Sequence, residues 1–247
     1  MGEQRVAIVT GGVRGIGAAI TCRLAEQGIH VAAGYSRSDL PAQELQERLT
    51  KEGHSVSVHA GNVGVPTDCQ RVVDEVMALK GRVDILVNNA GVTVDKTVRK
   101  MTVEDWHAVL RVNLSGSFYM TKAVLEQMIA QNYGRIVNIS SAIGATGGVG
   151  QANYAASKSG QFGFAKSLAR EVARKGITVN CVTPGYTETE MVAAVPENVL
   201  ANILTTIPVG RFAQPEEIAR AVTFLTDEQA GYITGAVIAV NGGWDMS

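Results

Sequence analysis

Short apolar runs rich in valine and isoleucine alternate along this chain with longer segments of helical pattern. Most of the runs lack strict polar alternation, which is typical of parallel strands because helices cover both faces of such a sheet. Strand alternating with helix predicts a doubly wound α/β fold with right-handed crossovers. We expect seven parallel strands, at 5–10, 30–35, 55–60, 83–89, 134–140, 177–183 and 236–241, and helices at 15–28, 39–52, 66–80, 102–131, 152–175 and 215–226.

Length and composition favour a single domain over residues 1–247. A chain of 247 residues with 46% hydrophobic residues suits one large α/β domain, and no repeat or linker divides it. The formal net charge of −1 gives no reason to expect nucleic acid or an anionic membrane as a partner. No signal peptide and no apolar run of membrane-spanning length stands out, so we expect a cytoplasmic protein.

The cysteines and histidines give no sign of a metal site. Cys22, Cys69 and Cys181 are far apart and outside any C-x-x-C pattern, which favours ordinary thiols over a disulfide framework. The histidines show no clustered or i,i+4 spacing. We therefore expect no metal ion.

Two segments differ from ordinary connections. Residues 140–154 follow the fifth expected strand and are rich in glycine, and residues 183–215 separate the sixth strand from the last helix. The second segment is too long for a plain loop, so we interpret it as a substrate lid with helical pieces of its own. Both segments follow the carboxyl ends of strands, where open α/β sheets bind their ligands.

The first strand runs into the glycine-rich turn TGGVRGIG, residues 10–17. Such a turn lets backbone N–H groups and the following helix N-terminus approach a pyrophosphate. Gly11, Gly15 and Gly17 are spaced G-x-x-x-G-x-G, unlike the general dinucleotide fingerprint G-x-G-x-x-G. A purely structural turn is the alternative, but its place between a buried strand and an apolar helix favours a nucleotide. Ile16, inside the turn, belongs to the same candidate site.

The end of the second strand bears on which nicotinamide dinucleotide would bind. NAD sites often place an acid there for the ribose 2′-hydroxyl, whereas NADP sites offer a cation to the 2′-phosphate. Here Tyr35, Ser36 and Arg37 close the strand, no acid comes before Asp39, and Arg14 lies in the glycine turn. Two guanidiniums without a competing carboxylate favour NADPH. The alternative is that Arg37 is a solvated loop cation.

Several motifs together resemble those of the short-chain dehydrogenase/reductase family, over essentially the whole chain. They are TGGVRGIG (10–17), NNAG (88–91), the asparagine of RVNLSGS (Asn113), NISS (138–141), YAASK (154–158) and TPGYTETEM (183–191). The resemblance implies a Rossmann-like fold and a catalytic set of Asn113, Ser141, Tyr154 and Lys158. It also implies cofactor contacts at Asn62, Val63, Asn89, Ala90, Gly91, Tyr154, Lys158, Pro184, Gly185, Thr187 and Thr189.

Each residue of this catalytic set has a chemical task. Tyr154 would protonate the alkoxide that develops when a ketone accepts a hydride. Its i,i+4 spacing to Lys158 puts a phenol and an ammonium on one helix face, so we expect the ammonium to lower the pKa of the phenol. Ser141 would donate a hydrogen bond to the substrate carbonyl, and Asn113 would hold a relay water. Taken singly, each residue has an ordinary alternative as part of a helix face or loop.

The segments around these motifs resemble the branch of the family that reduces 3-oxoacyl thioesters. This branch contains the acetoacetyl-CoA reductases of polyhydroxyalkanoate biosynthesis and the 3-oxoacyl-(acyl-carrier-protein) reductases of fatty-acid biosynthesis. The resemblance implies a (3R)-3-hydroxyacyl thioester as product and a homotetramer as the assembly. The alternatives are a reductase of another ketone and a non-catalytic NADP-binding sensor, although the intact catalytic set argues against the sensor.

Candidate substrate contacts come from two groups of residues. Gln151 and Tyr186 flank the expected pocket and would position the substrate. Arg99, Lys100 and Arg135 could meet an acidic carrier protein or a CoA phosphate, or could be ordinary surface charges. The sequence leaves the choice between CoA and carrier protein open.

Overall fold

The computed structural model describes residues 4–37, 39–189 and 197–246. Its strands form one parallel sheet of seven strands in the order β3-β2-β1-β4-β5-β6-β7. The doubly wound fold predicted from the alternating pattern is therefore confirmed. The strands are β1 (Val6–Val9), β2 (His30–Tyr35), β3 (Val56–Ala60), β4 (Ile85–Asn88), β5 (Gly134–Ile139), β6 (Ile177–Pro184) and β7 (Val237–Val240).

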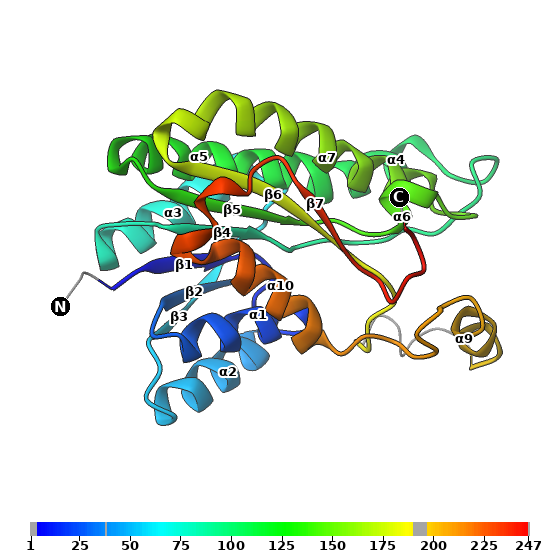
Figure 1. The fold of residues 1–247 in the computed structure, drawn as a ribbon, viewed down its shortest axis with the longest axis horizontal. Coiled ribbons are helices and arrows are strands. Elements are labelled where there is room, and N and C mark those ends of the chain that lie inside the picture. Colours follow the sequence, from blue (N-terminus) through cyan, green and yellow to red (C-terminus); the bar gives the residue numbers. More distant parts are fainter. Residues whose placement is uncertain (1–3, 38, 190–196, 247) are drawn as a thin grey trace.

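Helices cover both faces of the sheet (Figure 1). One face is covered by α3 (Pro66–Lys80), α5 (Gly116–Gln131) and α7 (Ala152–Val172). The other is covered by α1 (Gly15–Glu26), α2 (Asp39–Lys51) and α10 (Pro215–Thr226). Successive residues of β1 point into the two cores in turn, with Ile8 in the first and Val9 in the second. A strand buried on both faces needs no polar residues, which explains its unbroken apolar run.

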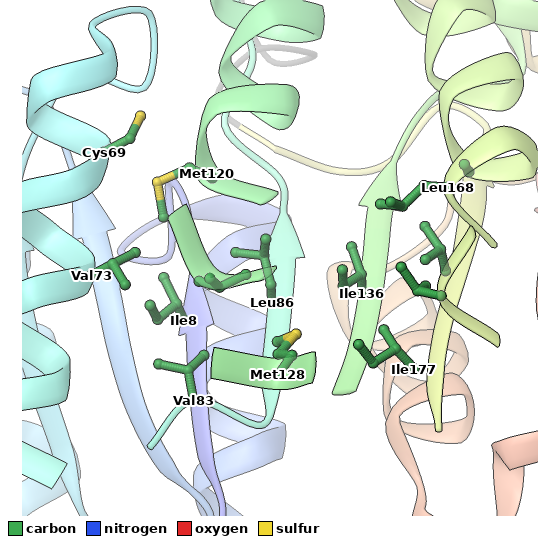
Figure 2. Packing of buried hydrophobic residues seen from close by; sticks show 14 of the residues in the cluster. Ile8, Cys69, Val73, Val83, Leu86, Met120, Met128, Ile136, Leu168 and Ile177 are labelled. Carbon is green, nitrogen blue, oxygen red and sulfur yellow. The ribbon is translucent and has the colours of Figure 1, made fainter. Parts of the chain in front are cut away.

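Figure 2 shows the core beneath α3, α5 and α7. Ile8, Leu86 and Ile136 come from neighbouring strands and meet Met120 and Met128 of α5, and all five side chains are buried. Burial of an aliphatic side chain of this size contributes about 1.5–3 kcal/mol. This packing fixes the position of α5 on the sheet.

Local signals in the sequence determine several helix ends. Pro66 occupies the first turn of α3, and Gly81 ends that helix in the left-handed conformation, with φ of 73°. The Thr102 hydroxyl and the Asp105 carboxylate form a capping box at the start of α4 (Val103–Leu110). At α10, which begins with a proline as expected, the Glu217 carboxylate accepts a hydrogen bond from Gln214 N–H at 2.8 Å.

The sequence predicts one helix over 102–131, and the structure corrects this prediction. Between α4 and α5 the chain forms a π-helix over Arg111–Ser115. A π turn holds an extra residue and is frequent at functional sites. Asn113 lies at its centre, where simple helical periodicity gives no sign of it.

The two irregular segments contain short helices. α6 (Ile143–Thr146) lies in the first, and α9 (Glu197–Leu204) lies in the expected lid, of which residues 190–196 fall outside the described residues. Short 3-10 turns follow α7 and α10, at Ala173–Lys175 and Glu228–Tyr232. No helix in the described ranges is long and apolar enough to cross a membrane.

Candidate active site

The candidate site lies along the carboxyl edge of the sheet, by which we mean the segments that directly follow the strands. The strand order reverses between β1 and β4, since the chain passes from β1 outward to β2 and from β4 outward to β5. Doubly wound sheets bind nucleotides in the crevice at this switch point. The glycine turn follows β1 and the NNAG segment continues from the end of β4, so both lie at the switch point.

The glycine turn is shaped so that only glycine fits at several positions. Gly11 and Gly15 have φ of 61° and 51°, a region that other residues rarely adopt. A Cβ atom at Gly17 would lie 2.0 Å from the carbonyl oxygen of Gly11. The turn therefore has no side chain at these three positions and leads directly into the first N–H groups of α1, which is the arrangement that binds a pyrophosphate.

The segment directly after β4 holds this turn in place. The Asn89 amide donates hydrogen bonds to the carbonyls of Thr10 (2.9 Å) and Gly11 (3.1 Å). In return, the Thr10 hydroxyl oxygen accepts from the backbone N–H groups of Asn89 (2.9 Å) and Ala90 (3.0 Å). The Asn89 amide therefore supports the turn. Thr10 was not among the expected site residues, because a strand-end threonine in the sequence gives no sign of its partners 79 and 80 residues away.

The two arginines expected at a 2′-phosphate are both exposed at this edge. Arg14 precedes the first residue of α1, and Arg37 and Ser36 follow the end of β2. A hydrogen bond of 2.9 Å from Gly12 N–H to the Gly34 carbonyl joins the glycine turn to β2. The cations thus lie on adjoining segments without a carboxylate residue between Tyr35 and Arg37.

Asn62 and Val63 follow β3, the next strand outward. The Asn62 side-chain oxygen accepts a hydrogen bond from Gly64 N–H (2.9 Å). The backbone N–H of Asn62 donates to the Asp68 carboxylate (2.8 Å). Val63 packs closely on the start of α5, where a Cβ atom at Gly116 would lie 2.8 Å from it. The loop is therefore fixed by its own contacts beside the turn, and one lone pair of the Asn62 oxygen is already in use.

Three of the four expected catalytic residues meet where β5 and α7 come together. Tyr154 and Lys158 lie one turn apart on α7, with the ammonium 5.6 Å from the centre of the phenol ring. Ser141 follows β5 and its hydroxyl hydrogen-bonds the phenol. The Lys158 ammonium donates to the Ile139 carbonyl at 2.7 Å. A serine, a phenol and a buried ammonium therefore share one small region.

The ionisation of this group differs from the expectation in one respect. Burial raises the pKa of the Tyr154 phenol above its ordinary value, while the Ser141 hydrogen bond opposes this and the Asp95 charge adds to it. The expectation that Lys158 lowers this pKa is therefore wrong: the pKa is raised, and the charge of Lys158 is not among the causes of the shift. Burial also lowers the pKa of Lys158 to about 8. Both shifts have the same physical cause, since each charged form is poorly solvated in this region.

Asn113, the fourth expected residue, is fully buried in the π turn. Its side-chain oxygen accepts from Val92 N–H (2.8 Å), and its amide donates to the Val92 carbonyl (3.0 Å) and the Ser157 hydroxyl (3.2 Å). Its backbone carbonyl accepts from Ser117 and Gln161. Asn113 thus joins the segment after β4 to α7.

Gly91 lies at the junction of these residues. A Cβ atom there would lie 3.5 Å from the Asn113 side-chain oxygen and 3.7 Å from the Lys158 nitrogen. The chain after β4 therefore passes close to both residues, which the structure brings together although they are 45 residues apart in the sequence.

The segment after β6 closes the other side of the site. Ala142 N–H donates to the Pro184 carbonyl at 3.0 Å, and the Thr187 hydroxyl donates to the Gly185 carbonyl at 3.2 Å. A Cβ atom at Gly15 would meet the Thr189 methyl group at 3.4 Å. The expected nicotinamide-side segment therefore lies against the glycine turn.

The two candidate substrate contacts are half-buried on either side of this region. The Gln151 amide donates to the Asp95 carboxylate at 3.2 Å. The Tyr186 ring packs against Phe212 and Trp244, with ring centres 6.1 and 5.2 Å away. Asp95 was not among the expected site residues, since only the fold brings it to Gln151. Burial raises the pKa of Tyr186, and the charge of Asp95 adds to this.

The three candidate cations for a carrier protein or CoA separate into two places. Arg99 and Lys100 are exposed in the loop before α4. Arg135 is buried at the opposite edge of the sheet, where it donates to four backbone carbonyls and stacks on Tyr133 at 4.5 Å. Arg135 is therefore a structural residue, and the expectation of a surface role for it is wrong. No group of three or more ligating side chains suited to a metal occurs among the described residues.

These features fit a dinucleotide better than any smaller ligand. A glycine turn leads into the N-terminus of α1, exposed cations flank it, and a hydrogen-bonding serine, phenol and ammonium group stands beside it. A hydride carrier lying along the carboxyl edge would place its two ends at these two groups.

Comparison with known proteins agrees with this geometry. The sequence model of the short chain dehydrogenase family matches residues 5–200 of this chain. Acetoacetyl-CoA reductase of Shinella zoogloeoides is 49% identical over 241 residues, which cover 97% of this chain and 98% of that protein. Acetoacetyl-CoA reductase of Allochromatium vinosum is 45% identical over 98% of this chain and 99% of its own length. 3-oxoacyl-(acyl-carrier-protein) reductase of Escherichia coli is 45% identical over 99% of this chain and 98% of its own. The chain therefore belongs to the short chain dehydrogenase family and is an oxidoreductase.

Proposed function

We propose that this chain is an NADPH-dependent reductase of 3-oxoacyl thioesters that forms the (3R)-3-hydroxyacyl thioester. The observation that carries the proposal is the meeting of Ser141, Tyr154 and Lys158 beside the glycine turn. The names of the relatives, which act on acetoacetyl-CoA or on 3-oxoacyl groups of a carrier protein, support this class of substrate.

The bound cofactor would supply the hydride that reduces the ketone. Backbone N–H groups at Gly11, Gly15 and Ile16 would bind its pyrophosphate. Arg14 and Arg37, with Ser36, would bind the 2′-phosphate that distinguishes NADPH from NADH. Asn62, Val63 and the NNAG segment would border the adenosine, and the turn from Pro184 to Thr189 would border the nicotinamide.

Tyr154 would act as the general acid. Because burial raises its pKa, the phenol keeps its proton at neutral pH until the developing alkoxide takes it. Ser141 already hydrogen-bonds this phenol, so a substrate carbonyl between the two hydroxyls could accept from both. That arrangement stabilises negative charge on the carbonyl oxygen as it forms.

Lys158 would stabilise the phenolate after the proton has left. With a pKa of about 8, the lysine still carries its charge in most molecules at neutral pH. It would also hold the ribose hydroxyls next to the nicotinamide. Asn113 fixes the neighbouring backbone through Val92, and a water bound at the π turn would relay protons onward.

Acetoacetyl-CoA is the thioester that we favour, because two of the relatives compared above are named for it. Arg99 and Lys100 are exposed in the same loop as Asp95 and could bind CoA phosphates. The second candidate is a thioester on a carrier protein, which the name of the Escherichia coli relative favours. Gln151 and Tyr186 would position either substrate.

We further propose that the chain forms a homotetramer and works in the cytoplasm. Phe118 of α5 is exposed and packs edge-on against Phe164 of α7, which leaves an aromatic surface on these helices. Strand β7 is the last in the sheet order and exposes Val237. Both surfaces suit burial against another copy, and light scattering of the purified protein would measure the assembly.

The direct test is the loss of NADPH absorbance with acetoacetyl-CoA, followed by chiral analysis of the product. We expect turnover and the (3R) isomer. Confirmed NADPH binding without oxidation by any 3-oxoacyl thioester would favour the sensor alternative. Comparison of kcat/KM for acetoacetyl-CoA and acetoacetyl-carrier-protein would decide between the two thioesters.

A further inference from the structure

A carboxylate stands at the entrance of the site, which we define by Asp95, Gln151, Tyr154 and Tyr186. Asp95 is exposed in the loop between β4 and α4 and accepts the hydrogen bond of 3.2 Å from Gln151. No task in the proposed reaction uses this charge. An unassigned carboxylate beside a general acid calls for a chemical explanation.

The loop that carries Asp95 is fixed to the first turn of α7. The Asn153 amide donates to the Val94 carbonyl at 3.1 Å, and Lys96 N–H donates to the Gly150 carbonyl at 2.8 Å. The adjacent cation does not neutralise Asp95, because the Lys96 ammonium pairs with Asp105 at 2.7 Å. The carboxylate is therefore held in a defined place by the backbone on both sides.

That place is at the start of the helix that carries the reacting group. Gln151 is the N-cap residue of α7, and Tyr154 lies in the first turn of this helix. The carboxylate that binds Gln151 is therefore held at the same helix end as the phenol. Its field acts on both tyrosines of the entrance, since its negative charge is among the causes that raise the pKa of Tyr154 and of Tyr186.

We propose that Asp95 is a specificity residue that excludes free 3-oxo acids and admits their uncharged thioesters and esters. The inference rests on the proposed function. A 3-oxo acid such as acetoacetate carries its carboxylate two carbons from the ketone, where the thioester carries a neutral group. With the ketone at Tyr154, that second carboxylate would lie near Asp95, and two like charges at such a distance repel.

Asp95→Asn removes the charge and leaves an oxygen that can accept the Gln151 hydrogen bond. We would measure competitive inhibition of acetoacetyl-CoA reduction by acetoacetate and by methyl acetoacetate, which is similar in size and uncharged. The inhibition constant of acetoacetate is expected to fall about tenfold in the variant. A change of this size corresponds to the repulsion between two like charges that are partly exposed to solvent. The constant of the ester is expected to stay within about twofold.

A matched control is Asp74→Asn. Asp74 is also an exposed aspartate that accepts a hydrogen bond from a glutamine, here from Gln70 at 2.8 Å, and it lies on α3. This control should change neither constant. If Asp95→Asn leaves the ratio of the two constants as in the wild type, or shifts both constants equally, Asp95 does not discriminate by charge. If the wild type reduces no 3-oxoacyl thioester, the proposed function itself fails, which is a separate result.

Discussion

Both edges of the sheet carry charged side chains, but the partners of these charges differ between the two edges. At the amino edge, where the strands begin, the buried Asp84 carboxylate binds Arg82 at 2.7 Å and Val6 N–H at 2.8 Å. Arg5 pairs with Glu228 at 3.4 Å. At the carboxyl edge, the buried Lys158 ammonium binds the neutral Ile139 carbonyl, and no described carboxylate pairs with it.

This difference separates charges that hold the fold from charges that are available for chemistry. A paired and hydrogen-bonded ion at the amino edge stabilises the contacts between strands. An ammonium buried without a counter-ion is costly and its pKa moves toward neutral, which is typical of functional sites. The contrast predicts that changes at one edge affect stability and changes at the other affect turnover.

The largest effect is expected for Tyr154→Phe. Loss of the general acid should lower kcat by about 10²–10⁴-fold, while the affinity for NADPH stays nearly unchanged. Steady-state kinetics and a cofactor titration would measure both. Tyr232→Phe is the control, since Tyr232 is fully exposed on the 3-10 turn after α10. Retained activity in Tyr154→Phe would refute its role as the acid.

The matching change at the amino edge is Asp84→Asn. It removes the charge that binds Arg82 and places an amide against its donors, so the free energy of unfolding should fall by about 3 kcal/mol. Urea unfolding would measure this loss, and kcat of the folded variant should match the wild type. Glu44→Gln, an exposed change on α2, should leave stability unaltered. A large fall in kcat for folded Asp84→Asn would break the comparison.

Lys158→Met tests the cost of the unpaired charge. Because burial lowers the pKa of Lys158 from 10.5 to about 8, the folded state releases its proton before the unfolded state does. The lysine therefore destabilises the fold below about pH 8, and this penalty disappears as the pH rises to the unfolded pKa. At neutral pH the variant should be more stable than the wild type by roughly 3 kcal/mol, and inactive.

The measurement for Lys158→Met is the difference in unfolding free energy from wild type across pH 7 to roughly 10.5. The difference should shrink with rising pH, since only the wild type gains stability by this route. A difference independent of pH would show that burial of the Lys158 charge does not lower the stability of the fold.

The smallest effect is expected for Arg37→Ala, at the exposed end of the carboxyl edge. We expect the Kd for NADPH to rise about tenfold, because the loss of one charge-assisted hydrogen bond to a phosphate lowers the free energy of binding by about 1.4 kcal/mol. The Kd for NADH should not change, and Arg23→Ala on the outer surface of α1 should change neither. Equal weakening of both cofactors would indicate that Arg37 does not bind the 2′-phosphate.

The parts of the fold that depend on local pattern could be predicted from the sequence. Apolar runs and helical periodicity gave the strands to within a few residues, and Pro66 and Pro215 correctly marked two helix starts. The spacing of Tyr154 and Lys158 predicted a shared helix face, which the structure has. These features depend on contacts within a few residues of one another.

The parts that depend on distant contacts could not be predicted. The Thr10 hydroxyl is important only because it accepts hydrogen bonds from the backbone of Asn89 and Ala90. Asp95 is important only because the fold brings it to Gln151 at the start of α7. Arginine is usually a surface residue, yet four backbone carbonyls from three regions surround Arg135. Periodicity also could not place the π turn at Asn113, since the side-chain pattern continues through it.

That π turn has a consequence for how the chain tolerates deletion. Removing one residue from Arg111–Ser115 would let α4 and α5 join as one regular helix, with no break in hydrogen bonding. Because the wide turn already accommodates the additional residue, the side chains of α4 and α5 would keep nearly the same orientations relative to each other. The deletion would instead remove the wide turn that places the Asn113 side chain against Val92 and its carbonyl against Ser117 and Gln161. The additional residue therefore serves the candidate site, and a shorter, more regular helix would still pack on the sheet.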